Sequence, residues 1–126
     1  MTKVVLDTNV YISAIIFGNN PKKIIKLAQN QKIQICISAS ILLEIAQKLK
    51  HKFSWNTNQI KHAIKTISKT VTLVHPSDPT DNKIINCALE AKTKFIISGD
   101  KHLLSLKKYK NIKILPPAQL LNLLPF

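Results

Sequence analysis

Short runs of β-branched and other apolar residues alternate along this chain with segments of helical periodicity, and this alternation strongly restricts its fold. The predicted strands are residues 3–6, 33–37, 71–74, 95–97 and 112–115. The predicted helices are at about residues 10–16, 21–28, 40–50, 56–68, 81–91, 102–106 and 117–123. Strands that alternate with helices form a mostly parallel sheet covered on both faces. We therefore expect a three-layer α/β/α fold with a five-stranded parallel sheet, built by residues 1–126 as a single domain.

The charged residues are strongly unbalanced. Nineteen basic residues face six acidic ones, for a net charge of +13, and every basic residue is a lysine. Lysine is a point charge suited to phosphate and poorly suited to bidentate recognition of bases. This favours a polyanion such as RNA as a partner, although a lysine-rich surface that only interacts with solvent remains an alternative.

The remaining composition limits location and chemistry. No stretch of about 18 uninterrupted apolar residues is present, so no membrane span is expected. The opening residues do not resemble a signal peptide, and we expect a cytoplasmic protein. Cys36 and Cys87 lie in apolar runs, which predicts buried, reduced thiols.

The few acids carry more information than the many bases. Asp7 and Asp100 each come directly after, or within three residues of, a predicted strand. Sites in parallel sheets lie beyond the carboxyl ends of the strands, so the two side chains should share one crevice if their strands are neighbours. The alternative is that Asp7 only caps a helix and Asp100 only belongs to a turn.

Glu44 lies among apolar residues in a predicted helix. It either pairs at the surface with Lys48, four residues later, or turns inward, where a buried carboxylate needs a cation. Asp78 and Asp81 precede the next predicted helix, where either could act only as a cap. Several carboxylates in one crevice repel each other unless a hard cation such as Mg²⁺ or Mn²⁺ lies among them.

Four segments, in this order, resemble the PIN-domain family: VVLDTNVYISA, ISASILLEIAQKL, DPTDNKIINCALEAK and FIISGDKHLL. The resemblance covers nearly the whole chain and is strongest to the VapC-like toxins of toxin–antitoxin pairs. It implies a five-stranded parallel sheet of Rossmann-like order and a metal-dependent endoribonuclease that uses Mg²⁺ or Mn²⁺. It also implies an RNA substrate, a cognate antitoxin protein as partner, and a homodimer.

The resemblance also assigns roles to individual residues. It implies that the catalytic, metal-binding acids are Asp7, Glu44, Asp81 and Asp100. We expect Asp7 and Asp100 to be direct ligands, and Glu44 and Asp81 to hold the metal through water or to support the direct ligands. Supporting roles fall on Thr8, Asn9, Ser98 and Asp78. Because the chain has no arginine, contacts to RNA phosphates would fall to Lys101, His102 and Lys83.

Four other functions make different demands on the sequence. A non-catalytic RNA- or protein-binding module of the same fold should have lost one or more acids, and an RNA-processing nuclease outside any toxin pair would keep them. A haloacid-dehalogenase-like hydrolase would need a second Asp where Asn9 stands. Two glycines cannot form a Gly-rich phosphate loop.

Overall fold

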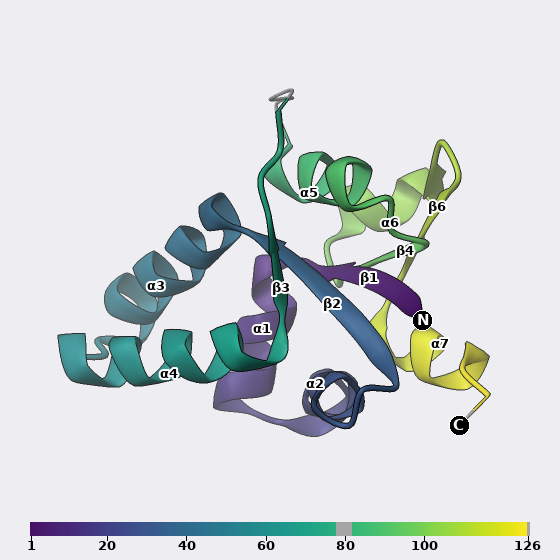
Figure 1. Cartoon of the computed structure of the whole chain (residues 1–126). Helices are drawn as coiled ribbons and strands as arrows, with labels where there is room; N and C mark the ends of the chain where they lie inside the picture. The colour runs from purple at the N-terminus through teal and green to yellow at the C-terminus, as the bar shows by residue number, and fades with distance from the viewer. Residues whose placement is uncertain (78–81, 126) are drawn as a thin grey trace.

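The computed structural model describes residues 1–77 and 82–125, and a twisted sheet with helices on both faces lies at its centre (Figure 1). The sheet has six strands within these residues, in the order β3-β2-β1-β4-β6-β5. All neighbours are parallel except β5 and β6. The strands are β1 (Thr2–Leu6), β2 (Ile33–Ser38), β3 (Thr72–Val74), β4 (Phe95–Ile97), β5 (Lys108–Tyr109) and β6 (Ile112–Leu115).

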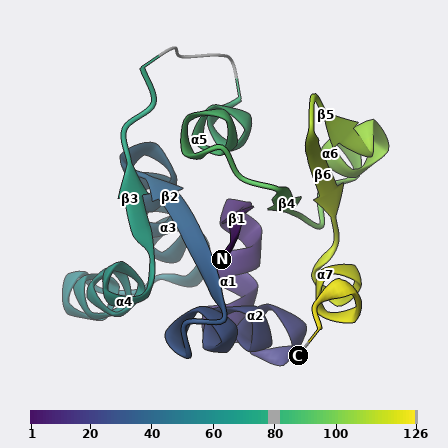
Figure 2. The same ribbon diagram turned by 45° about the vertical axis from the view of Figure 1, so that its right-hand side comes forward.

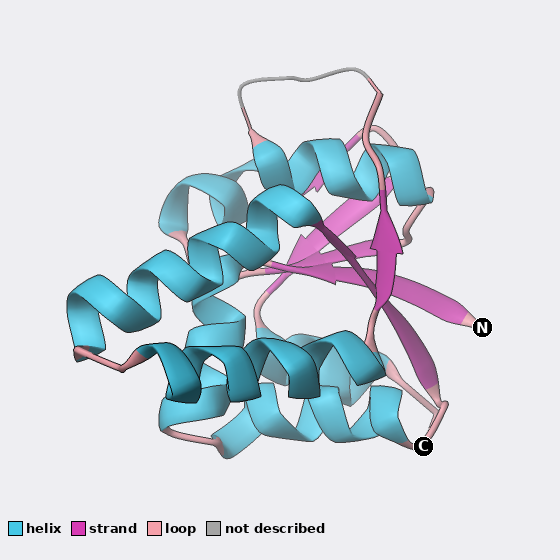
Figure 3. Cartoon of the chain, turned by 60° about the vertical axis from the view of Figure 1, so that its left-hand side comes forward, coloured by secondary structure: helices cyan, strands magenta, loops and turns pink. Residues whose placement is uncertain are grey.

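The helices form the outer layers. They are α1 (Thr8–Ile16), α2 (Asn19–Gln29), α3 (Ala39–Phe53), α4 (Thr57–Thr70), α5 (Lys83–Ala91), α6 (Lys101–Leu106) and α7 (Pro117–Leu123). Helix α5 packs on β1, β2 and β4, and α6 packs on β6. Figures 2 and 3 show α1, α2 and α4 on the opposite side of the sheet from α5. The three-layer fold expected from the sequence is therefore confirmed.

The core lies on both faces of the central strands. Val4, Val5 and Leu6 of β1 and Ile96 and Ile97 of β4 are completely buried. A strand whose successive side chains point to opposite faces can be fully apolar only when both faces are covered, as here. Free, buried Cys36 and Cys87 belong to the same core, which confirms the predicted thiols.

Local capping explains where several helices begin. The Ser38 side chain accepts a hydrogen bond from the Ile41 backbone at the start of α3. Asn56 and Gln59 form a reciprocal capping box at the start of α4. These short polar side chains pair backbone N–H groups that the first helical turn cannot pair internally.

The strand count and several helix bounds differ from the sequence predictions: α1 and α2 each begin two residues earlier than expected, and α3 ends three residues later. The sheet has six strands instead of five, because the two-residue strand β5 pairs antiparallel with β6 around a turn in which Lys110 has a φ of 53°. Helix α5 begins at Lys83, two residues later than expected, because the Asn82 side chain accepts hydrogen bonds from the Ile84 and Ile85 backbones. No helix within the described residues is long and apolar enough to cross a membrane.

Candidate functional site

The pairing of β1 with β4 places two strand ends side by side. Leu6 and Ile97 are partners in the parallel register, so the residues that follow them, Asp7 and Ser98, lie next to each other. The Asp7 backbone N–H donates to the Ile97 carbonyl oxygen at 2.8 Å, which extends the ladder by one step. Polar side chains therefore follow both central strands, β1 and β4, at the carboxyl edge of the sheet.

Ser98 connects Asp7 to Asp100. Its hydroxyl donates to Asp7 Oδ2 at 2.9 Å, and its Oγ accepts from the Asp100 backbone N–H at 2.9 Å. Ser98 is completely buried, while Asp7 is half-buried and Asp100 is exposed. A buried hydroxyl that uses both donor and acceptor capacity fixes the relative position of the two acids.

The side chain of Asp100 caps a helix, whereas that of Asp7 does not. Asp7 occupies the N-cap position of α1, but its side chain makes no capping hydrogen bond there and is bonded to Ser98. Asp100 does cap α6, because its Oδ2 accepts from the Leu103 backbone N–H at 3.2 Å. The position of the Asp7 carboxylate is therefore not explained by helix capping.

Glu44 pairs across the site with a lysine from another helix. Lys83 Nζ donates to Glu44 Oε2 at 2.8 Å, and the two side chains are 43% and 29% exposed. The alternative pairing with Lys48 does not form, because Lys48 donates to Asn9 Oδ1 at 2.9 Å. Glu44 is thus partly inward, as the apolar neighbours suggested, and its counter-ion in the structure is Lys83.

The environment of Glu44 favours its charged form. Burial raises the pKa of Glu44, but the polar and charged groups around it together lower it by more, and the hydrogen bond from Lys83 is the largest of these lowering contributions. Smaller contributions come from Lys48 and from the Thr8 hydroxyl, which lies nearby without completing a hydrogen bond of ordinary geometry. The net pKa lies below the ordinary value of 4.5, so this carboxylate is ionised at neutral pH.

These side chains surround one open pocket of about 290 Å³ at the carboxyl edge of the sheet. Three of the predicted acids line it, although they come from the ends of β1 and β4 and from the second turn of α3. The lining residues are Asp7, Asn9, Glu44, Asn82, Lys83, Ile84, Asp100 and Leu103.

The chemistry of this pocket fits a hard divalent cation. Carboxylate and amide oxygens are the ligands that Mg²⁺ and Mn²⁺ prefer. Thr8, the residue after Asp7, is completely buried and does not line the pocket, and its Oγ1 has no hydrogen-bond partner in the described part of the chain. Within residues 1–77 and 82–125, no three Asp, Glu, His or Cys side chains are close enough to enclose an ion unaided.

The other predicted site residues are placed as follows. Asp78 and Asp81 lie outside the described residues, so the fourth acid and the additional one stay predictions. Lys101 and His102 are exposed at the start of α6, directly after Asp100, and do not line the pocket. Asn9 and Lys83 do line it.

Sequence reasoning missed Asn82 and the position of Lys48. Asn82 caps α5 and lines the pocket, and its signal was the Asx residue directly before the apolar helical repeat. Lys48 holds Asn9, a contact between residues 39 positions apart for which the sequence offers no local signal.

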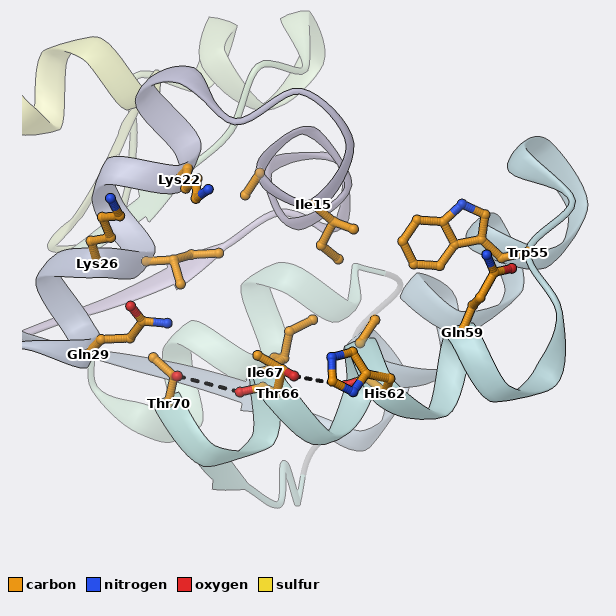
Figure 4. Close-up of a pocket in the computed structure, with 13 residues that line it drawn as sticks. Ile15, Lys22, Lys26, Gln29, Trp55, Gln59, His62, Thr66, Ile67 and Thr70 are labelled. Carbon is orange, nitrogen blue, oxygen red and sulfur yellow. Dashed lines mark hydrogen bonds between the residues drawn. The ribbon is translucent and has the colours of Figure 1, made fainter.

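A second pocket, of about 270 Å³, lies between α1, α2 and α4 (Figure 4). Ile15, Ile25 and Trp55 give it an apolar lining, and Lys22 and Lys26 contribute cations from α2. None of its lining residues is shared with the carboxylate pocket.

Comparisons with known proteins identify the family of this chain and a related protein. Residues 3–102 match the family model of the PIN domain. The chain is 41% identical over 125 residues to the uncharacterized protein MJ1680 of Methanocaldococcus jannaschii, covering 89% of this chain and 80% of that protein.

A solved structure shares the fold. It is the crystal structure of VapBC2 from Rickettsia felis bound to a DNA fragment from their promoter, in which one chain matches with a TM-score of 0.65 and 15% identity. The match covers 90% of this chain and 97% of that one. At this identity the likeness establishes a shared fold, whereas the match over residues 3–102 establishes the family. This chain belongs to the PIN domain family.

Proposed function

We propose that this protein is a metal-dependent endoribonuclease that hydrolyses RNA phosphodiester bonds, with Asp7, Glu44, Asp81 and Asp100 as its catalytic acids. The observation that carries the proposal is that Asp7, Glu44 and Asp100 line a single pocket at the carboxyl edge of the sheet. Membership of the PIN domain family supports it. The chain has only six acids, and three of them line this one pocket of a strongly basic protein. A metal site accounts for this gathering of negative charge.

Asp7, Asp100, Asp81 and Glu44 would hold Mg²⁺ or Mn²⁺, with Asp7 and Asp100 as direct ligands. Such an ion lowers the pKa of a bound water and stabilises charge on the leaving oxygen. Ser98 keeps Asp7 and Asp100 at a fixed separation, and Lys48 holds the Asn9 amide at the pocket edge. The two hydrogen bonds of Ser98 position the acids before substrate arrives.

The RNA backbone would be held by cations beside the pocket. Lys101 and His102 are exposed on the first turn of α6, next to Asp100, and Lys83 lines the pocket. Lysine charge around an acidic crevice attracts phosphates without reading sequence. We propose Lys101, His102 and Lys83 as the phosphate contacts.

Cleavage assays with matched variants test the proposal. The purified full chain is given a labelled RNA that has paired and single-stranded segments, with Mg²⁺, with Mn²⁺ or with chelator. We expect cleavage with either metal and none with chelator. Asp7→Asn and Asp100→Asn should each reduce the rate by at least about 100-fold, since an ion-stabilised charge is worth several kcal/mol.

Glu90→Gln is the matched control, because it removes an acid that lies on α5 and does not line the carboxylate pocket. Glu90 is exposed, and its Oε1 accepts hydrogen bonds from Ser77, away from the carboxylate pocket. This variant should cleave at the wild-type rate. Full cleavage by both Asp variants, or cleavage in chelator, would reject the assignment. RNA binding without any cleavage would favour a non-catalytic module of the same fold.

We further propose that the protein is the toxin of a toxin–antitoxin pair and acts in the cytoplasm. The similar chain from Rickettsia felis comes from VapBC2, which supports a two-protein system. An antitoxin with an acidic amphipathic segment would suit the pocket between α1, α2 and α4, since Ile15 and Trp55 offer apolar contact and Lys22 and Lys26 offer charge (Figure 4). A homodimer stays a prediction.

Expression and fluorescence test this second proposal. Expression of the wild-type chain should arrest growth, Asp7→Asn should not, and co-expression of a short reading frame adjacent to the gene should restore growth. Trp55 is the single tryptophan of the chain, so its fluorescence reports directly on that pocket. Complex formation that leaves the Trp55 spectrum unchanged would place the partner elsewhere. A cleaving enzyme that never arrests growth would favour RNA processing outside a toxin pair.

A further inference from the structure

Lys83 lies in an electrostatically unfavourable place for a lysine. It is the first residue of α5, where the helix presents unpaired N–H groups and the positive end of its dipole. The first turn of α5 contains no acidic residue that could compensate for this charge. A cation at this helix end is destabilising unless another element supplies an anion.

Glu44 on α3 supplies that anion. The 2.8 Å contact between Lys83 Nζ and Glu44 Oε2 joins residues 39 positions apart, and both side chains line the carboxylate pocket. Lys48 is four residues from Glu44 on the same helix, a spacing at which Glu–Lys pairs commonly form. It nevertheless donates to Asn9. Glu44 therefore pairs with Lys83 and not with Lys48, although Lys48 is much closer to it in sequence.

We propose that Lys83 is a built-in counter-ion, which occupies Glu44 in the metal-free protein and competes with the divalent cation for that carboxylate. The inference rests on the proposed function, because it requires Glu44 to be one of the metal-holding acids. An ammonium group hydrogen-bonded to a carboxylate repels a second cation that approaches the same oxygen atoms. Binding of the metal therefore requires Lys83 to leave Glu44.

The release of Lys83 has a consequence for the substrate. Its side chain is 43% exposed at the pocket, so an ammonium freed from Glu44 can turn to a phosphate without crossing the core. An RNA phosphate that binds Lys83 leaves Glu44 available to the metal, and the metal in turn leaves Lys83 available to the phosphate. Such a linkage is reciprocal: each ligand raises the affinity of the other.

Calorimetric titration of Mn²⁺ into the full chain tests the competition. We compare the wild type, Lys83→Gln and Lys48→Gln at the same ionic strength. Lys48 is the matched control, because its charge acts on Glu44 while its hydrogen bond goes to Asn9. We expect Lys83→Gln to bind Mn²⁺ about fivefold more tightly, the upper range for loss of a partly exposed ion pair, and Lys48→Gln to gain less than about twofold.

Thermal unfolding provides a readout that needs no catalysis. In chelator, Lys83→Gln should melt at a lower temperature than the wild type, because Glu44 loses its counter-ion. In saturating Mn²⁺ this difference should disappear, because the wild-type Lys83 no longer pairs with Glu44.

The outcomes separate this inference from the nuclease proposal. An unchanged Mn²⁺ affinity in Lys83→Gln, or an equal gain in both variants, overturns the role of Lys83 and leaves the metal site standing. Tighter binding by Lys83→Gln than by Lys48→Gln supports it. Absence of Mn²⁺ binding in all three proteins overturns the metal site itself, and the inference with it.

Discussion

The Ser98 hydroxyl donates a hydrogen bond to Asp7 Oδ2 at 2.9 Å, across 91 residues of sequence, while its oxygen accepts from the Asp100 backbone. One buried side chain thus fixes the two acids that we propose as direct metal ligands. Their relative position depends on the pairing of β1 with β4 and on a serine rather than on the loops that carry the acids.

Ser98→Ala should weaken both the fold and the site. The substitution removes two hydrogen bonds made by a buried hydroxyl, to Asp7 and to the Asp100 backbone, each of which contributes about 0.5–1.5 kcal/mol. Because Asp7 and Asp100 then lose their common anchor, we expect cleavage to fall by about tenfold as well. Urea denaturation measures the unfolding free energy, and initial cleavage rates measure the second effect.

Ser105→Ala is the matched control for that experiment. Ser105 is exposed on α6, and its hydroxyl donates to the His102 carbonyl oxygen at 2.7 Å. We expect its unfolding free energy to stay within about 0.5 kcal/mol of the wild type. Equal losses in the two serine variants would show that the buried bridge has no special role.

Much of the fold could be predicted from the sequence because the elements that form it are locally encoded. Apolar runs such as residues 95–97 are strands by composition, and Ser38 and Asn56 mark helix starts by their side-chain chemistry. That Asp7 and Asp100 share one crevice was predicted from the rule that parallel strands end at the same edge, on the condition that their strands are neighbours, which the pairing of β1 with β4 meets.

Other contacts depend on tertiary placement that no local pattern encodes. The partner of Glu44 could not be read from α3, whose own Lys48 suggested a pair that does not form. The residues of β5 become a strand only because the turn at Lys110 brings them beside β6, and two residues are too few to show a pattern.

Glu44 should make the stability of the metal-free protein depend on pH. The pKa of Glu44 in the folded protein is below 4.5, so its stabilising effect is fully present above that pH. The effect is lost as the pH falls through the lower, folded-state value. Below pH 4.5 the unfolding free energy of the wild type should therefore decline more steeply than that of Glu44→Gln, as urea denaturation in chelator can measure.

Two lysine variants check the cause of that pH dependence. Lys83→Gln removes the strongest influence that lowers the pKa of Glu44, and it should flatten the decline nearly as much as Glu44→Gln. Lys48→Gln removes a weaker one and should flatten it less. A decline in Glu44→Gln as steep as in the wild type would assign the acid sensitivity to other groups.

The buried thiols should resist alkylation until the protein unfolds. Burial raises the pKa of Cys87 to about 12, with a smaller contribution from Cys36, and burial also raises the pKa of Cys36. Only the thiolate attacks iodoacetamide, and at pH 8 both groups stay protonated inside the fold. Mass spectrometry should find neither labelled in buffer and both labelled in urea. Rapid labelling of Cys87 in buffer would contradict its position in the core.

Lys101 should contribute one phosphate contact to RNA binding. It is exposed on α6 directly after Asp100, so an RNA strand bound at the carboxylate pocket would pass close to it. With Asp7→Asn as a background that does not cleave, affinity for a single-stranded RNA is measured over a range of salt concentrations. For a single strand, each neutralised phosphate contributes about −0.7 to the slope of log affinity against log salt concentration, so Lys101→Gln should reduce the magnitude of this slope by about that amount.

Lys65→Gln is the control, because Lys65 lies on the exposed face of α4, which leads to the opposite edge of the sheet, where β3 begins. This variant should leave the slope unchanged. Equal slopes for the two lysine variants would mean that RNA does not follow α6 to the carboxylates.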